Sequence, residues 1–293
     1  MSLKESLGRK AFLLTNGLLL IIIGCITIYP LLYVTFASFS DANTLMAFDG
    51  VLLYPLKPNI EAYKAVFKNS FILTGYLNTI MIVVFGVLIN LVTTTIAAYF
   101  FSRRGVMHQK LLMKIVMFTM FFSGGLVPTY LWLKQIGLFD NLLVLILPGA
   151  ISTTNMIIMR TAFYNVPASL EESARLDGAG HLTILIRVIV PLVMPTIAVI
   201  ALYYSVGHWN SWFNASIYIT KRSLYPLQLV LREILITNET ASMLTDATVA
   251  EQASISETIK YAVIMVSTIP ILCLYPFLQR FFVNGVMIGA VKE

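Results

Sequence analysis

Apolar residues along the chain fall into six runs that polar stretches separate. A membrane-spanning helix needs about 20 mostly apolar residues. The apolar residues within each run are continuous and do not alternate with polar ones, which favours helices over the strands of a membrane barrel. The pattern therefore predicts an all-α integral membrane protein with six transmembrane helices in a single domain, residues 1–293. The expected spans are Ala11–Ala37, Ile80–Phe101, Leu111–Leu133, Leu142–Met159, Ile184–Val206 and Tyr261–Leu278.

Composition agrees with a membrane protein surrounded by lipid. The chain is 58% hydrophobic and only 12% charged, with a mean hydropathy of +0.83. Soluble domains carry about 25% charged residues, so about half of the usual solubilising charge is missing. The net charge is +6, but the basic residues form no patch or stripe, and no nucleic-acid partner is expected.

The distribution of charge predicts how the chain is oriented. If the N-terminus is cytoplasmic, the inner segments hold twelve of the 20 basic residues but only five of the 14 acidic ones. Cytoplasmic segments of membrane proteins carry the excess of Lys and Arg. Both termini are therefore expected in the cytoplasm, and the two long loops 38–79 and 210–260 are expected outside. Loops of this length often carry function, and a docking surface for an external protein is one such role.

Several kinds of chemistry are missing from the sequence. It contains no GxxxxGK[ST] phosphate loop, no HExxH or GxSxG motif and no Cys/His cluster. No enzymatic activity, catalytic residue, metal or bound cofactor is therefore expected in this chain. No Asp or Glu lies inside any of the six runs, whereas ion-coupled carriers place acidic groups or broken helices at the midplane of the membrane. This disfavours the alternative of a stand-alone secondary carrier or channel for a small polar solute, and leaves it open.

One charged segment, residues 161–185, interrupts the apolar runs on the predicted cytoplasmic side. Ser169 and Glu172 have the spacing of a capping box, which predicts the start of a short helix. Gly178 is well placed to end that helix in a left-handed cap. A second helix is expected from near His181 into the fifth run.

The expected short helix has features of a docking element. Leu170, Ser173, Ala174 and Asp177 follow helical spacing and would form a face of small residues that a partner can approach closely. Pro191 and Pro195 are expected to bend the fifth run just after the segment. A push on the helix would then reach the span. The physical features alone fit an ordinary interfacial hairpin equally well.

At this segment the sequence resembles a known family. EESARLDGAG followed by VIVP is similar to the EAA loop of the membrane subunits of ABC importers, with Ser173 in place of the usual first Ala. The LDGA form resembles the carbohydrate-importer branch, close to the second permease of the maltose system. NTIMIVV from Asn78, GGLVPTYLWLKQIGLFDN from Gly124 and PFLQRFFVNGVMIGAVK from Pro276 resemble the permeases for aldouronate- or alginate-type oligosaccharides.

This resemblance implies a function and a set of partners. The implied fold is that of an ABC type I importer permease, and the implied function is ATP-driven, binding-protein-dependent import of an oligosaccharide across a bacterial inner membrane. A second related permease, two ATP-binding-cassette ATPase subunits and an extracytoplasmic solute-binding protein are implied, with ATP and Mg on the ATPases. In the family the loop helix couples the ATPases to the spans. The residues carried over to that coupling role are Glu171, Glu172, Ser173, Ala174, Asp177, Gly178 and Ala179.

Four polar or aromatic residues are candidates for the substrate pathway. Trp209 and Asn210 lie at the outer end of the fifth run, where an aromatic face can stack on a sugar ring and an amide can bind hydroxyl groups. Asn90 and Thr94 lie inside the second run. Interfacial anchoring of the Trp and packing between helices are the alternative roles.

Overall fold

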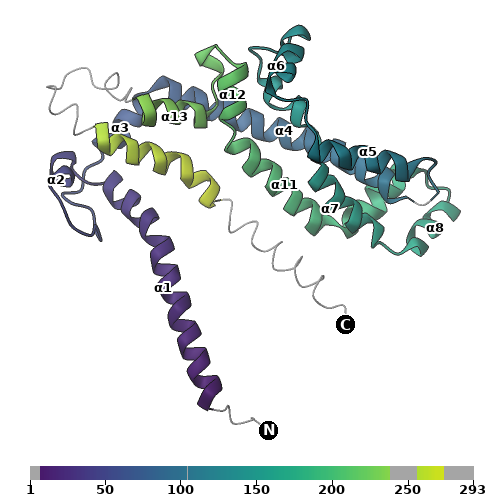
Figure 1. Ribbon diagram of the computed structural model, residues 1–293, viewed down its shortest axis with the longest axis horizontal. Coiled ribbons are helices and arrows are strands. Elements are labelled where there is room, and N and C mark those ends of the chain that lie inside the picture. Colours follow the sequence, from purple (N-terminus) through teal and green to yellow (C-terminus); the bar gives the residue numbers. More distant parts are fainter. Residues whose placement is uncertain (1–6, 104, 238–255, 274–293) are drawn as a thin grey trace. The chain divides into compact units, whose positions relative to one another are not determined.

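The computed structural model of the chain describes residues 7–103, 105–237 and 256–273 (Figure 1). It divides into two compact units, Met1–Asn69 with Glu233–Thr268, and Ser70–Arg232 with Ile269–Glu293. Within the described residues every regular element is a helix. The sequence from Pro276 that resembles the importer family, and the last residues of the sixth predicted span, lie outside the described residues.

The first unit contains two long apolar helices. They are α1 (Leu7–Ser38) and the helix Ser256–Cys273, of which the last residues belong to the second unit. The short helices α2 (Ala42–Met46) and α3 (Glu61–Lys68) follow α1 within the segment predicted as an outer loop. The 18-residue apolar window of α1 has none of its residues buried within the chain, as expected for a helix that lipid or another subunit covers.

The second unit holds the remaining elements, which are short except for α4 and α11. In chain order these are α4 (Ser70–Ser102), α5 (Gln109–Phe121), α6 (Leu126–Gln135), η1 (Leu142–Leu145), η2 (Leu147–Gly149), α7 (Thr153–Tyr164), α8 (Ala168–Leu176), α9 (His181–Ile184), the π-helix η3 (Leu185–Ile189), α10 (Val190–Leu192), α11 (Met194–Trp209), α12 (Phe213–Tyr218), η4 (Arg222–Leu224) and α13 (Leu227–Thr237), which runs into the first unit.

The helix α4 extends beyond the predicted second span at its N-terminal end. The helix α4 starts at Ser70, ten residues before the expected start at Ile80, and has 33 residues. At 1.5 Å per residue it is roughly 50 Å long, longer than the roughly 30 Å hydrocarbon layer. The apolar pattern weakens at Gly75 and Asn78, but both are buried, and the Asn78 amide donates to the carbonyls of a neighbouring turn.

Three helices are long and apolar enough to cross a membrane, and the described residues give up to six spans if each of three bent pairs is one span. The bends are 110° between α5 and α6, 50° between the η1–η2 segment and α7, and 87° between His181–Leu192 and α11. The third bend was predicted from Pro191 and Pro195, and both prolines lie in the first turn of a helix there. The other two bends were not predicted. They lie at Gly125, with a φ of +83°, and after Gly149.

Two apolar clusters pack along α4 and hold the second unit together. One joins the C-terminal half of α4 to α7, η3 and α11 through Ala98, Met159, Phe163, Ile189 and Ile200. The other joins its N-terminal half to α6, η1, α12 and α13 through Ile82, Leu133, Leu145, Tyr218 and Leu229. Because α4 contributes to both clusters, an element that packs against α4 is connected through it to the rest of this unit.

Candidate functional site

The start of α8 differs from the prediction. Its N-cap is Pro167, with φ −56° and an extended ψ of 129°. The predicted capping box of Ser169 and Glu172 is wrong, because no side chain caps this end and Ser169 already lies in the first turn. The ring of Pro167 fixes a φ that a helix can continue, so the helix begins before Ser169.

The end of α8 is the predicted left-handed cap. Gly178 has a φ of +81°, and its amide donates to the Arg175 carbonyl at 3.0 Å. The Ala179 amide donates to the Ala174 carbonyl at 2.9 Å. This pair of hydrogen bonds is a Schellman motif, which satisfies carbonyls left over at the end of the helix and reverses the chain.

The seven residues predicted to couple α8 to a partner fall into two groups. Leu176, which was not among them, has 90% of its surface exposed at the tip of the helix. Ala174 and Ala179 pack against the cluster of α4, α7 and α11, so the predicted face of small residues is not one exposed surface. The exposed group is Glu172, Ser173, Asp177 and Gly178, and the partly buried group is Glu171, Ala174 and Ala179.

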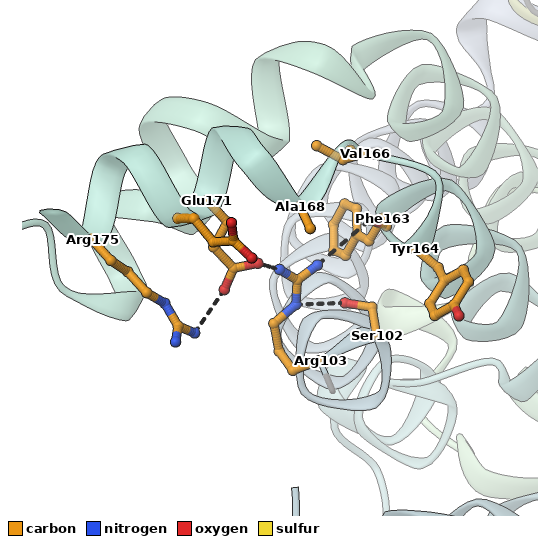
Figure 2. A pocket seen from close by; sticks show the side chains of 9 residues that line it. Ser102, Arg103, Phe163, Tyr164, Val166, Ala168, Glu171 and Arg175 are labelled. Atoms are coloured by element: carbon orange, nitrogen blue, oxygen red, sulfur yellow. Dashed lines mark hydrogen bonds and ion pairs between the residues drawn. The ribbon is translucent and has the colours of Figure 1, made fainter. Parts of the chain in front are cut away.

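Glu171 lies between two arginines (Figure 2). One carboxylate oxygen forms an ion pair with Arg103, which follows α4, and the other accepts from Arg175 at 2.8 Å, one turn further along α8. The side chains of Arg103 and Glu171 are 14% and 15% exposed, whereas that of Arg175 is 52% exposed. A cavity of about 210 Å³ beside them is lined by Ser102, Arg103, Phe163, Tyr164, Val166, Ala168, Glu171, Glu172 and Arg175.

The guanidinium of Arg103 joins three helices. Besides Glu171 on α8, it donates to the Ser102 hydroxyl at 3.1 Å and to the Phe163 carbonyl of α7 at 3.5 Å. Its carbon lies 4.7 Å from the centre of the Tyr99 ring, a cation–π contact. The pKa of Arg103 lies below its usual value, chiefly because the guanidinium is buried. Tyr99 partly offsets this effect, and the positive charge of Arg175 adds to it. An arginine remains charged under such shifts, so the pairing is ionic.

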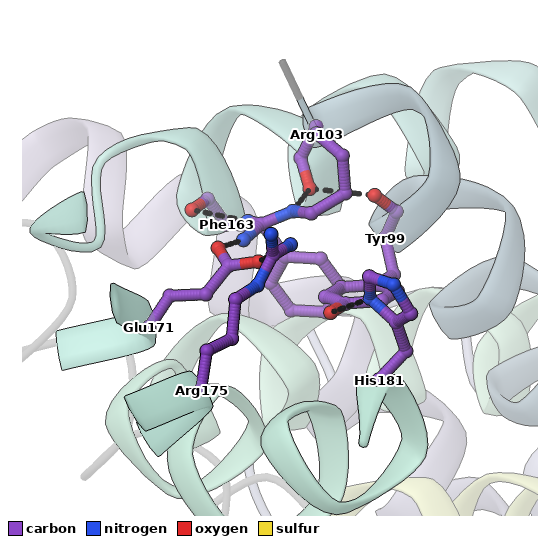
Figure 3. A network of polar contacts seen from close by, with 7 residues as sticks. Tyr99, Arg103, Phe163, Glu171, Arg175 and His181 are labelled. Carbon is purple, nitrogen blue, oxygen red and sulfur yellow. Dashed lines mark hydrogen bonds and ion pairs between the residues drawn. The ribbon is translucent and has the colours of Figure 1, made fainter. Parts of the chain in front are cut away.

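The same end of α4 contacts α9, α5 and α7. Figure 3 shows the contact with α9, in which the Tyr99 hydroxyl lies 3.5 Å from Nδ1 of His181, the first residue of that helix. The carbonyl of Phe101 accepts from Gln109 Nε2 and from Arg160 Nε, both at 2.7 Å. Carbonyls at the end of a helix lack partners within it, and here side chains from α5 and α7 supply them.

Sequence reasoning missed these partners of the predicted coupling helix. Arg103 was counted only among the charges that mark the cytoplasmic side, and Tyr99 was not singled out. Both are far from Glu171 along the chain, so no local spacing links them. The available signal was the pair Arg103–Arg104 just after the second apolar run, because charges at the edge of a span tend to pair with one another or with backbone carbonyls.

The candidate pathway residue Asn90 is buried and has all of its hydrogen-bonding groups occupied. Its amide nitrogen donates to the carbonyls of Gly149 and Ala150 at 2.7 and 2.9 Å. Its carbonyl oxygen lies 2.6 Å from Nε2 of His208, which must therefore be the donor. Asn90 thus joins α4 to α11 and to the break before α7.

The other three candidates differ in exposure. Thr94 is buried, and its hydroxyl lies 2.7 Å from the Tyr204 hydroxyl, which also accepts from the amide of Ser152 at 2.9 Å. Trp209 is buried with its ring against Tyr76. Asn210 is exposed, and its amide donates to the Val206 carbonyl at 3.0 Å. Only Asn210 presents its side chain at the surface of the chain, and a pathway role for all four stays a prediction.

His208 depends on a glycine of α4. A Cβ atom built on Gly86 would lie 2.6 Å from Nε2 of His208. No real side chain tolerates that distance, so the imidazole reaches Asn90 only because position 86 has no side chain.

Asp140 fastens the loop after α6 to the loop after α12. Its carboxylate accepts from the amide and the hydroxyl of Thr220, both at 2.6 Å, and from the amide of Lys221 at 3.0 Å. The Thr220 hydroxyl, followed by the Thr220 amide, lowers the pKa of Asp140. In the described part of the chain, no three His, Cys, Asp or Glu residues come together as a metal site would need.

The chain is similar to transport proteins over almost its entire length. The profile of the family described as "Binding-protein-dependent transport system inner membrane component" matches residues 110–288. The polygalacturonan/rhamnogalacturonan transport system permease protein YtcP of Bacillus subtilis (strain 168) is 38% identical over 277 residues, 93% of this chain and 95% of that one. Protein LplC of the same strain is 40% identical over 283 residues, 97% of this chain and 95% of that one.

A solved structure has the same fold. It is the crystal structure of a bacterial ABC transporter involved in the import of the acidic polysaccharide alginate. One of its chains is 30% identical in sequence, with a TM-score of 0.87, and the match covers 96% of this chain and 100% of that one.

Proposed function

The chain belongs to the family of binding-protein-dependent transport system inner membrane components, and from that premise we propose that it is the permease subunit that moves an acidic oligosaccharide inward across the cytoplasmic membrane. The predicted family and the predicted all-α fold of an ABC type I importer permease are confirmed by the profile match and by the TM-score of 0.87. The expected role as a transport subunit is confirmed with them.

One observation carries the substrate class. A relative that is 38% identical over 93% of this chain is named for polygalacturonan and rhamnogalacturonan, and the matching solved structure for alginate. These polymers contain sugars with carboxylate groups. The proposed substrate is therefore an oligosaccharide of uronic acids.

The energy for transport comes from partner subunits in this proposal. The sequence has no phosphate-binding loop of its own. Two ATPase subunits would bind ATP and Mg, a second related permease would complete the transmembrane pathway, and a solute-binding protein would deliver the sugar outside. Alternating access of the two permeases then moves the sugar inward.

In the proposed orientation, both termini and α8 are cytoplasmic. The excess of basic residues on that side supports it. The exposed residues Glu172, Ser173 and Asp177 and the exposed tip at Leu176 give α8 a surface for an ATPase subunit. The continuous path from α9 through η3 and α10 to α11 carries its displacement toward the membrane.

Reconstitution of the complex tests the proposal. The chain is co-expressed with a second permease, an ATPase and a binding protein of the same organism, and the purified complex is placed in liposomes that enclose Mg-ATP. We expect uptake of labelled trigalacturonate that requires both enclosed ATP and external binding protein. Uptake by this chain alone, without ATP, would instead establish the stand-alone carrier. A binding protein that takes only neutral trisaccharides would contradict the substrate class.

A further inference from the structure

Two adjacent glutamates on α8 have different surroundings. Glu172 is exposed, whereas the side chain of Glu171 is 15% exposed and lies between Arg103 and Arg175. A carboxylate that is already paired on both oxygens has little left to offer a partner subunit. The resemblance to importers assigned both glutamates to the surface that meets the ATPase, and the contacts separate them.

The ion pair between Glu171 and Arg103 joins α8 to α4. Arg175 also lies on α8, so its contact with Glu171 stays within that helix and does not connect α8 to another element. Arg103 directly follows α4, and its other contacts, with Ser102, Tyr99 and Phe163, fix the guanidinium on α4 and α7.

The end of α4 also contacts the start of α9, the helix that follows α8 in the chain. Tyr99 lies under the guanidinium of Arg103 and reaches His181 with its hydroxyl, so α4 touches both α8 and the start of α9 (Figure 3). The end of α4 is itself held by Gln109 and Arg160, which occupy the carbonyl of Phe101. The helix α8 is thus attached to a fixed point and not to a loose helix end.

We propose that Glu171 and Arg103 are positioning residues that link α8 directly to α4, in addition to the chain itself, which joins α8 to α7 on one side and through α9 to α11 on the other. This inference rests on the proposed coupling role of α8. Movement of α8 then displaces α4 as well as α11, and α4 supports both apolar clusters of its unit. Glu172 remains on the outer side of α8 for the ATPase.

The ion pair reaches a helix that the chain path does not. From α8 the chain passes the π-helix η3 and an 87° bend before it reaches α11, and in the other direction it runs back into α7. Ala174 on α8 and Ala179 just after it also pack against the cluster that includes α4, but each has only a methyl group to transmit a sideways displacement. An ion pair between two largely buried side chains resists both separation and sliding.

The test is a double-mutant cycle on the reconstituted complex. The variants are Arg103→Gln, Glu171→Gln and the two combined, with Arg175→Gln as the matched control that removes the other partner of Glu171. The quantity measured is the number of sugar molecules imported per ATP hydrolysed, on complexes that contain all subunits. A change of fold alone would lower both rates together, and loss of a coupling link lowers the ratio.

We expect each single variant at positions 103 and 171 to lower the ratio at least tenfold, the combined variant to lower it no further, and the control to stay within twofold of wild type. A ratio within twofold of wild type in either single variant, or an additive loss in the combined one, overturns the proposal. If the single variants do not assemble, the exchanged pair Arg103→Glu with Glu171→Arg, made in the Arg175→Gln chain, decides. Recovery of assembly and ratio supports the link, and no recovery refutes it. A wild-type complex without ATP-dependent import would instead refute the proposed function.

Discussion

Replacing Gly178 separates two roles of the turn that ends α8. The residue has a φ of +81°, which ordinary side chains adopt at a cost of about 1 to 2 kcal/mol. A Cβ atom there would meet no other atom of the described chain within 4 Å. A substitution therefore strains the backbone but causes no collision within the protein. Any larger effect must come from a partner that approaches this turn.

Four substitutions separate strain from docking. Gly178→Ala and Gly178→Leu carry the same strain but differ in bulk. Gly178→Asn and Gly178→Asp have side chains of equal size that both tolerate the left-handed conformation, and they differ in charge. A strain of about 1 to 2 kcal/mol is small against a typical stability of 5 to 15 kcal/mol, so all four variants should insert in the membrane at the wild-type level.

If an ATPase subunit packs on this turn, bulk and charge decide the outcome. Within the first pair we expect Gly178→Ala to retain at least half of wild-type uptake of labelled oligosaccharide and Gly178→Leu less than a tenth. Within the second pair we expect Gly178→Asp to retain less uptake than Gly178→Asn, which has the same size. Immunoblots of membranes and co-purification of the ATPase provide the controls. Equal uptake within both pairs would refute docking at this turn and leave strain as the only effect.

Three further predictions concern packing and pH. Asn90→Leu leaves the Gly149 carbonyl and His208 Nε2 without their hydrogen-bond partner, which costs about 1 to 3 kcal/mol for each group. The substitution should lower the Tm of the purified complex but leave the KM for sugar of the folded complex unchanged. Gly86→Ala forces His208 away from α4 and should lower the Tm in the wild-type chain, but add little to a His208→Ala variant, as a cycle of Tm measurements would show. The lowered pKa of Asp140 gives a stabilisation that is present above its unfolded pKa of about 3.9 and is lost as pH falls through the folded pKa. Asp140→Asn should therefore lower the Tm at pH 7, and the difference should shrink in acid; a difference that stays constant would exclude this contribution.

Local chemistry explains which features of the fold could be predicted from the sequence. The apolar runs, the left-handed Gly178 and the bend at Pro191 and Pro195 each depend on residues that are neighbours in the chain. The start of α8 was misplaced by a local signal as well, because Ser169 and Glu172 have capping-box spacing but Pro167 begins the helix first. Local signals compete, and the sequence alone does not rank them.

The sequence could locate the coupling segment but could not separate its exposed residues from its partly buried ones. The motif from Glu171 to Gly180 identifies the segment, yet no local pattern indicates that Glu171 is paired and Glu172 is exposed. They differ because Arg103, which directly follows α4, lies where α8 passes, and that is a consequence of how α4 and α7 pack. A pairing between distant segments needs the folded chain.

The polar residues inside α4 follow one physical rule that changes how they are interpreted. Backbone groups in a membrane must find hydrogen-bond partners within the protein. Where a neighbouring segment of the same chain is not helical, its backbone groups therefore need donors and acceptors from another helix. Asn90 supplies them to Gly149 and Ala150, in the break before α7, and Asn78 supplies them to the turn at η4. A polar side chain in an apolar run is therefore as consistent with a helix break in a neighbouring segment of the chain as with a pathway for sugar. Asn210, which is exposed at the end of α11, does not serve such a break and remains the stronger candidate for contact with the substrate.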